Sequence, residues 1–337
     1  MSSHFIKFTE QTNTGIIKLN RPDALNALNY EMAVDFLEIL SKWKTTHFIK
    51  RVLLLGEGKA FCAGGDVKSL FSSSNKNTLK ETFFQKEYTL NYNINEFPKN
   101  YLTVWNGLVM GGGVGLSIYG NYRLATEKAK FAMPETAIGF FPDVGGSYFL
   151  SQLKNGIGAY LGLTGKVLNV RDMIDLGIAT HYLPSEGLCK TIDEYIKKGN
   201  INSSSYYPEM SSEITENKNF IEDTFQNDLS EIMKKLKNSK EEFGQKIYHH
   251  LLSRCPMSLA VSIKLINNAK SKSLKECLEI EYQLSQHMVY RNDFNNGVDS
   301  VLVSKNNRPQ WSPSTIEEIN YDEVNKMFEP HIKKLYL

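Results

Sequence analysis

Three consecutive glycines, Gly111 to Gly113, constrain the fold of this chain more than any other feature. An apolar segment at 102–105, which we predict to be a strand, precedes them, and a short helix-compatible run follows at 114–119. Glycine lacks a β-carbon, so a ligand can approach its backbone closely. The first N–H groups of a helix lack intrahelical partners, and the helix dipole favours negative charge there. The segment therefore suits close helix–strand packing, or an oxygen that becomes an anion during a reaction.

The common glycine-containing motifs do not fit this sequence. Ile118 stands where a dinucleotide-binding fingerprint needs its third glycine, and Val167 stands where a phosphate-binding loop needs Ser or Thr. Tyr119 breaks the Gly-x-Ser-x-Gly pattern around Ser117. These three departures from the motifs argue against a dinucleotide site, a nucleotide phosphate loop and a serine nucleophile elbow.

Composition limits the class of protein. The 337 residues are 41% hydrophobic and 23% charged, with a net charge of +2, as in ordinary globular chains with one large and one smaller domain. Such a balance predicts no nucleic-acid and no membrane partner. Four scattered cysteines lack metal-ligand spacing, so we predict no metal and a reducing compartment. The segment 1–8 shows no convincing presequence.

We predict a catalytic core at 1–199, a polar linker at 200–212 and a helical region at 213–337. Helices of that last region should begin at Pro256 and run from Leu274 to Tyr290.

In the core, strands are expected at 5–8 and 16–19, followed by a helix through Trp43 with Asn29 as its N-cap. A later helix at 169–176 should be followed by a strand at 177–180.

Two carboxylates, Glu135 and Asp143, lie among apolar residues. Loss of solvation raises a carboxyl pKa towards values useful in catalysis. The alternative is that both acids cap helices. Glu281 falls inside an apolar helical stripe, so we expect it to be buried with an ion pair or a capping partner. Glu87 has the pattern of an ordinary surface carboxylate.

The segments 60–66, 110–116 and 131–146 resemble the crotonase (enoyl-CoA hydratase/isomerase) superfamily, and most closely its 3-hydroxyisobutyryl-CoA hydrolase branch. The resemblance continues past the linker and covers nearly the whole chain. It implies an α/β fold, a spiral of repeated ββα turns followed by a C-terminal α-helical region. It also implies acyl-CoA substrates, with no cofactor besides the CoA of the substrate itself.

The resemblance also implies residue roles. Backbone N–H groups of Gly65 and Gly112 would form an oxyanion hole for the thioester oxygen. Glu135 would be the principal catalytic carboxylate with Asp143 as its partner, and Glu87 would contact substrate, which reverses its interpretation as a surface residue. The implied substrate-binding residues are Gly65, Asp66, Val67, Lys68, Glu87, Gly112, Glu135 and Asp143.

Gly115 distinguishes the branches, because hydratases of the family carry a second catalytic glutamate at this position. We therefore expect a thioester hydrolase that acts on 3-hydroxyisobutyryl-CoA, and also 3-hydroxypropionyl-CoA, in valine catabolism. Glu135 would act as general base or, as we prefer, as nucleophile through a mixed anhydride. The alternatives are an enoyl-CoA hydratase/isomerase and a non-catalytic assembly component. Family analogy predicts a mitochondrial location, with a cytoplasmic one as the alternative, and leaves room for a homo-oligomer.

Overall fold

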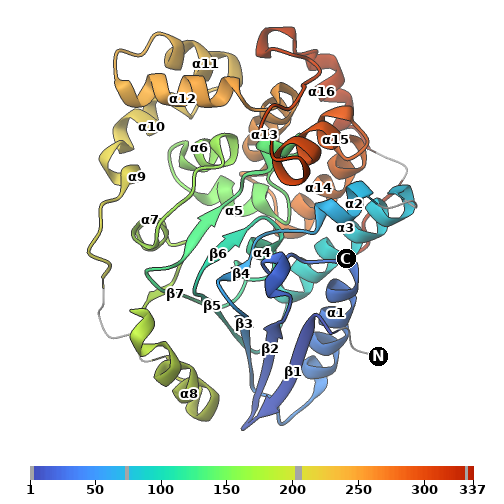
Figure 1. Cartoon of the computed structure of the whole chain (residues 1–337), viewed down its shortest axis with the longest axis vertical. Coiled ribbons are helices and arrows are strands. Elements are labelled where there is room, and N and C mark those ends of the chain that lie inside the picture. Colours follow the sequence, from blue (N-terminus) through green and yellow to red (C-terminus); the bar gives the residue numbers. More distant parts are fainter. Residues whose placement is uncertain (1–3, 73–75, 202–206, 331–332) are drawn as a thin grey trace. The chain divides into compact units, whose positions relative to one another are not determined.

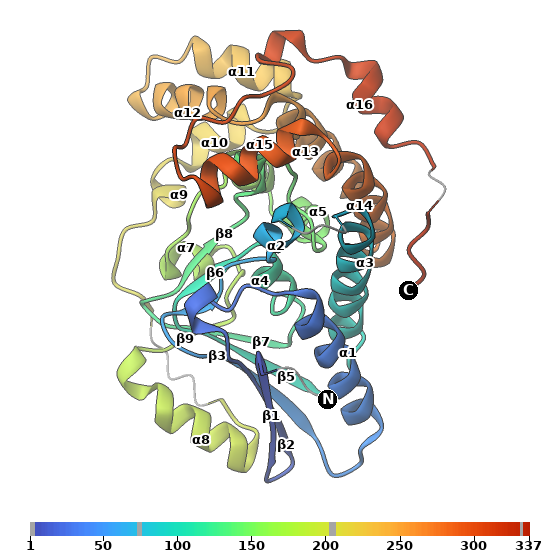
Figure 2. The ribbon, with the colours of Figure 1, turned by 45° about the vertical axis from the view of Figure 1, so that its right-hand side comes forward.

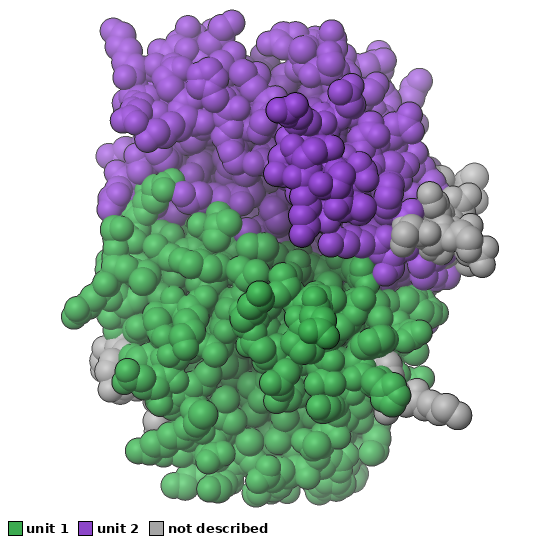
Figure 3. Space-filling view, in the orientation of Figure 1, with its two compact units in different colours: residues 1–66, 89–131, 167–213 green, residues 67–88, 132–166, 214–337 purple. Residues whose placement is uncertain are grey.

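The computed structural model describes residues 4–72, 76–201, 207–330 and 333–337. The chain divides into two compact units, each assembled from three stretches of sequence (Figure 3). Unit 1 comprises residues 1–66, 89–131 and 167–213, and unit 2 comprises residues 67–88, 132–166 and 214–337. The predicted domain boundaries stay a prediction, and residues 202–206 of the predicted linker lie outside the described residues.

Unit 1 is built on a six-stranded sheet of order β1-β2-β3-β5-β7-β9 and a three-stranded sheet of order β4-β6-β8 (Figure 1). The first two strands pair antiparallel, whereas β2-β3, β3-β5, β5-β7 and β7-β9 are parallel pairs. The strands are β1 (Ile6–Gln11), β2 (Thr14–Leu19), β3 (Arg51–Gly56), β4 (Ala60–Cys62), β5 (Asn100–Trp105), β6 (Leu108–Met110), β7 (Tyr122–Ala125), β8 (Lys130–Ala132) and β9 (His181–Tyr182).

Two helices, α1 (Tyr30–Thr45) and α8 (Leu188–Lys198), cover opposite faces of the larger sheet (Figure 2). Thr14 Oγ1 donates to the carbonyl of Ile196 on α8 at 3.1 Å. A β-carbon on the next residue, Gly15, would lie 2.6 Å from the Trp43 ring on α1. Successive strand residues face opposite sides of a sheet, so the two helices must lie on different faces. Unit 1 also contains α4 (Gly112–Gly115) and α7 (Val170–Asp175).

The predicted start of unit 1 is confirmed in its main elements. Asn29 caps α1, because its side-chain oxygen accepts a hydrogen bond from Met32 N at 2.9 Å. The predicted strand at 177–180 is wrong, since β9 begins at His181. Gly177 has a φ of 69° and ends the turn after α7, so the chain pairs with the sheet only beyond it.

Unit 2 is mostly helical. The predicted helix starts at Pro256 and Leu274 are confirmed, and the second helix ends at Met288 rather than Tyr290. Helix α13 packs on both α5 and α6. Helix α3 begins in unit 2 and ends in unit 1. The helices are α2 (Val67–Ser72), α3 (Lys76–Asn95), η2 (Glu135–Ile138), α5 (Gly146–Gln152), α6 (Ile157–Thr164), α9 (Glu213–Glu216), α10 (Lys218–Thr224), α11 (Leu229–Lys237), α12 (Glu242–Leu252), α13 (Pro256–Ala269), α14 (Leu274–Met288), α15 (Asn292–Val298), η4 (Asp299–Val303), η5 (Ile316–Glu318) and α16 (Tyr321–Met327).

Across the described residues, no helix combines the length and apolar character that a membrane crossing requires.

Candidate active site

The first glycine loop of unit 1 presents the backbone N–H of Gly65. Leu28 N donates to the carbonyl of Gly64 at 2.8 Å, and Asp66 N donates to the carbonyl of Leu28 at 2.7 Å. These two bonds form a parallel bridge between Leu28 and Gly65. In such a bridge the middle residue directs its own N–H away from its partner. The Gly65 N–H is therefore available to an acceptor other than Leu28.

The second glycine loop presents Gly112 at the start of α4. Gly111 adopts a φ of 45°, and the first intrahelical bond runs from Val114 N to the Gly111 carbonyl at 2.8 Å. The N–H of Gly112 precedes that bond and so has no partner in the helix. A β-carbon on Gly113 would lie 2.3 Å from the Cys62 carbonyl oxygen, so this position requires glycine. Both loops follow β4 and β6, which pair in parallel.

The remaining residues of the first loop divide between the two units. Asp66 is buried, and its carboxylate forms an ion pair with Arg21 at 2.7 Å. Arg21 also donates to the Ala27 carbonyl at 3.0 Å, so the pair fixes the segment that follows β2. Val67 and Lys68 are the first residues of α2, in unit 2.

In unit 2, Glu135 is the first residue of the 3-10 helix η2 and is 6% exposed. Gly139 closes this helix with a φ of 74°, and a β-carbon there would lie 2.5 Å from the backbone of Asp293. On the same side, a β-carbon on Gly297 would lie 2.4 Å from the Ile138 backbone. Glycines at both positions let η2 and α15 pack backbone to backbone. This packing fixes Glu135, whose buried Oε2 has no hydrogen-bond partner among the described residues.

Asp143 lies on a tight turn that precedes α5. Gly146 N donates to the Asp143 carbonyl at 2.7 Å, and Val144 between them has a φ of 54°. A β-branched residue in this region is strained by about 1–3 kcal/mol and persists only where the surroundings hold it. The Asp143 carboxylate accepts a hydrogen bond from the Tyr88 hydroxyl at 2.8 Å. Its side chain therefore faces Tyr88 on α3, and the alternative of a helix-capping role for Asp143 is not supported.

Glu281 supplies the carboxylate at the start of α5. It is fully buried and accepts hydrogen bonds from Gly145 N at 2.6 Å, from Ser147 N at 3.0 Å and from Ser147 Oγ at 2.5 Å. The expectation of a buried, partnered glutamate is confirmed in the form of a cap, and no ion pair involves it among the described residues. Glu281 therefore holds the strained turn that carries Asp143.

Glu87 is buried, contrary to its interpretation as a surface carboxylate, with 2% of its surface exposed. Its Oε1 also has no hydrogen-bond partner among the described residues. Burial, together with the charges of Asp143 and Glu135, raises the pKa of Glu87 well above its usual value. Burial and then the charge of Asp143 likewise raise the pKa of Glu135.

The pKa values of the other two acids, Asp143 and Glu281, are also raised. Burial raises the pKa of Asp143 to about 7, although the Tyr88 hydrogen bond opposes the change. Burial raises the pKa of Glu281 to about 8, against the hydrogen bonds from Ser147 and Gly145. Burial and the mutual repulsion of these carboxylates therefore favour sharing of protons within the group. Such a group can both accept and return a proton near neutral pH.

Tyr88 bonds to Asp143 and Ser147 bonds to Glu281, and no pattern in the sequence predicts either contact. Three aromatic rings are also stacked, which the sequence did not predict. The centroid of the Phe140 ring lies 5.3 Å from that of Phe84 and 4.5 Å from that of Phe141. The Phe84 ring also lies 5.8 Å, centroid to centroid, from the ring of Tyr88, which bonds to Asp143.

A mostly parallel α/β core, two glycine loops with backbone N–H groups and a buried group of acids define an enzyme of the acyl-CoA-processing class. The model of the protein family described as enoyl-CoA hydratase/isomerase matches residues 14–328 of this chain. The chain therefore belongs to the enoyl-CoA hydratase/isomerase, or crotonase, family, and it is an acyl-CoA enzyme of that family with the predicted crotonase fold.

Individual relatives agree with this assignment. The chain is 38% identical to the mitochondrial 3-hydroxyisobutyryl-CoA hydrolase of Homo sapiens, over 94% of this chain and 86% of that protein. It is 39% identical to the protein of the same name from Dictyostelium discoideum, over 93% and 88%. Among solved structures, a carnitinyl-CoA dehydratase from Mycobacterium thermoresistibile matches with a TM-score of 0.93 and 31% identity, over 99% of both chains. An enoyl-CoA hydratase from Rhodobacter sphaeroides matches with a TM-score of 0.93 and 28% identity, over 99% of this chain and 100% of that one.

Proposed function

We propose that this protein hydrolyses the thioester of 3-hydroxyisobutyryl-CoA, and also of 3-hydroxypropionyl-CoA, releasing the free 3-hydroxy acid and CoA in valine catabolism. The observation that carries the proposal is Gly115, which has no side chain where hydratases of the family carry their second catalytic glutamate. Adding water across a double bond calls on two carboxylates to place and transfer protons. Thioester cleavage can use one group of acids and a good leaving thiolate.

In the proposed mechanism, the backbone N–H groups of Gly65 and Gly112 hold the thioester oxygen as it gains negative charge. Each such donor is typically worth about a hundredfold or more in rate. The Glu135 carboxylate attacks the acyl carbon, the carbon–sulfur bond breaks, and the CoA sulfur leaves with the proton held by Asp143. A mixed anhydride between the acyl group and Glu135 remains.

Water then cleaves the anhydride. The Asp143 carboxylate takes one proton from the water, the carbon–oxygen bond to Glu135 breaks, and the 3-hydroxy acid is released. Glu135 and Asp143 return to their starting states. Trapping the intermediate with hydroxylamine tests the route, because a mixed anhydride gives a hydroxamate on Glu135 that mass spectrometry of peptides detects. Complete hydrolysis of substrate with no modified Glu135 would favour Glu135 as a general base on water.

A panel of thioesters tests the function itself. We expect fast release of free thiol from 3-hydroxyisobutyryl-CoA and 3-hydroxypropionyl-CoA, and slow release from acetyl-CoA. The two structural relatives are named as a dehydratase and a hydratase, which favours the alternative of hydration or dehydration. Loss of the crotonyl-CoA double bond without thiol release would establish that alternative, and inactivity of folded protein on every thioester would favour the non-catalytic one.

We also propose a mitochondrial location, supported by the relatives that carry this designation. A fluorescent protein fused to the C-terminus of the full chain tests it, and a purely cytosolic signal would contradict it.

A further inference from the structure

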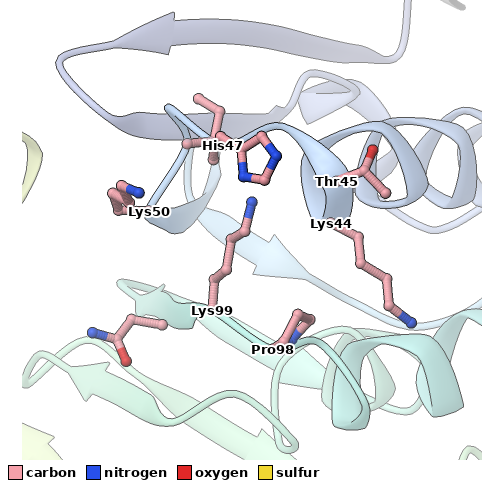
Figure 4. Close-up of a pocket in the computed structure, with 8 residues that line it drawn as sticks. Lys44, Thr45, His47, Lys50, Pro98 and Lys99 are labelled. Carbon is pink, nitrogen blue, oxygen red and sulfur yellow. The ribbon is translucent and has the colours of Figure 1, made fainter.

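A pocket lined by positive charge lies in unit 1, where α1 ends and strands β3 and β5 begin (Figure 4). Its volume is about 540 Å³. The basic side chains in its lining are those of Lys44, His47, Lys50 and Lys99, and no acidic residue lines it. Several separate cationic groups around one hollow suit an anion with several oxygens.

Lys99 covers the carboxyl end of α1, which would otherwise repel an anion. The carboxyl end of a helix carries partial negative charge on its unpaired carbonyls. Lys99 Nζ donates to the Thr46 carbonyl at 2.8 Å and also to the carbonyl of Trp43, both at the end of α1. Its ammonium group points towards His47 (Figure 4). An ammonium has three donors, so one stays available to a ligand.

The positive charge in the pocket is not neutralised by the protein. The neighbouring Lys42 forms an ion pair with Glu10 at 3.3 Å. In the described parts of the chain, Lys44, His47 and Lys50 form no ion pair. Burial is the main cause of the lowered pKa of Lys99, and repulsion from the charge of Lys50 adds to it. A bound anion would relieve this repulsion.

The pocket is separate from the glycine loops. Arg51 of β3 pairs with Asn100 of β5 at the beginning of both strands, and Asn100 lines the pocket. The chain runs towards the glycine loops only after these strands end, at Gly56 and Trp105. Strands of six residues span roughly 20 Å. The pocket therefore lies near the N-terminal ends of β3 and β5, whereas the chain leads to Gly65 and Gly112 from their C-terminal ends.

We propose that this pocket binds a small phosphate-bearing anion, at a site separate from the one that binds the acyl-CoA substrate. The shape favours a small ligand, because the charges surround a hollow and do not form a stripe along the surface. The pairing of Lys42 with Glu10 also interrupts the positive surface on one side. A long polyanion such as nucleic acid would need basic charge beyond the pocket.

Isothermal titration calorimetry on the full chain tests the site, with saturating CoA present so that the substrate site is filled. The probes are inorganic phosphate, pyrophosphate and ribose 5-phosphate. We expect saturable binding that is tighter for pyrophosphate than for phosphate and that weakens as the salt concentration rises. Ribose 5-phosphate binding more tightly than phosphate would mean that the ligand is a phosphate ester, and equal binding would mean that the pocket recognises the phosphate group alone.

The double variant Lys44→Gln/Lys50→Gln should weaken pyrophosphate binding by about tenfold or more, because it removes two charged hydrogen-bond donors. The double variant Lys197→Gln/Lys198→Gln is the matched control, since it removes the same charge from exposed positions at the end of α8. It should change binding by less than about twofold. A parallel titration without CoA completes the test. No saturable binding of any probe, an equal loss in both variants, or binding that is seen only without CoA would overturn the proposal.

Discussion

The hydrogen bond from Tyr88 to Asp143 is the contact that most directly sets the acid–base behaviour of the proposed site. Tyr88→Phe removes the hydroxyl that lies 2.8 Å from Asp143 Oδ2. It leaves the ring, whose centroid lies 5.8 Å from that of Phe84 and 6.4 Å from that of Tyr282. A hydrogen bond donated to a carboxylate favours the ionised form, so its loss raises the pKa.

Such a bond contributes about 1.5–3 kcal/mol, and one pKa unit corresponds to about 1.4 kcal/mol. The pKa of Asp143, about 7 in the wild type, should therefore rise by about 1–2 units. The assay is the pH dependence of kcat/KM for thiol release. In the proposed mechanism Asp143 must hold the proton that the leaving sulfur takes. The limb in which activity falls as pH rises should therefore move up by that amount, with activity near pH 7.5 raised about threefold to fourfold and little change at acidic pH.

Tyr282→Phe is the matched control, because it makes the same change on a neighbouring ring that is not bonded to Asp143. The limb belongs to the group of acids as a whole, so its displacement is the quantity to compare. A limb that stays in place in Tyr88→Phe, or moves equally in the control, would refute the reasoning.

Three further results are expected. Glu281→Gln should lower the free energy of unfolding by about 2–4 kcal/mol in urea denaturation, because an amide cannot accept all three hydrogen bonds; a loss below about 1 kcal/mol would contradict its role. The pKa of Glu281 is about 8 in the folded chain against an ordinary value of 4.5, so between these pH values the folded chain binds a proton that the unfolded chain does not. The stability of the wild type should therefore fall as pH rises through this range, and that of Glu281→Gln should fall less steeply. Equal slopes would argue against the raised pKa. Gly139→Ala should destabilise the chain by more than about 2 kcal/mol, because the φ of Gly139 is 74° and the new β-carbon would lie 2.5 Å from the backbone of Asp293. Gly177→Ala is the control and should cost about 1 kcal/mol, because Gly177 has a φ of 69° but no atom within 4 Å of the new β-carbon. Equal losses in thermal unfolding would contradict the close packing of η2.

Local signals in the sequence predicted those parts of the fold that local chemistry determines. Asn29 was predicted as a cap because its side chain satisfies an N–H of the helix that it begins. Pro256 was predicted as a helix start because its ring suits the first turn. The burial of Glu135, Asp143 and Glu281 followed from their apolar neighbours in sequence.

Contacts between distant segments could not be predicted in the same way. Tyr88 and Asp143 are 55 residues apart, and Ser147 and Glu281 are 134 residues apart, so no periodicity links them. Glu87 has a mixed neighbourhood on its helix, and only tertiary packing shows that it is buried. The partner of Glu281 was expected to be an ion or a cap, and the backbone of the turn before α5 determined which.

The central claim is that the buried Glu135 carboxylate performs thioester cleavage. The most direct measurement compares free-thiol release from 3-hydroxyisobutyryl-CoA by the wild type, by Glu135→Gln and by Glu241→Gln, a matched change at an exposed glutamate that caps no N–H of α12. We expect rapid release by the wild type and by Glu241→Gln, and a loss of kcat of about a thousandfold or more in Glu135→Gln. A Glu135→Gln protein that folds and still releases thiol at the wild-type rate would contradict the catalytic role of Glu135.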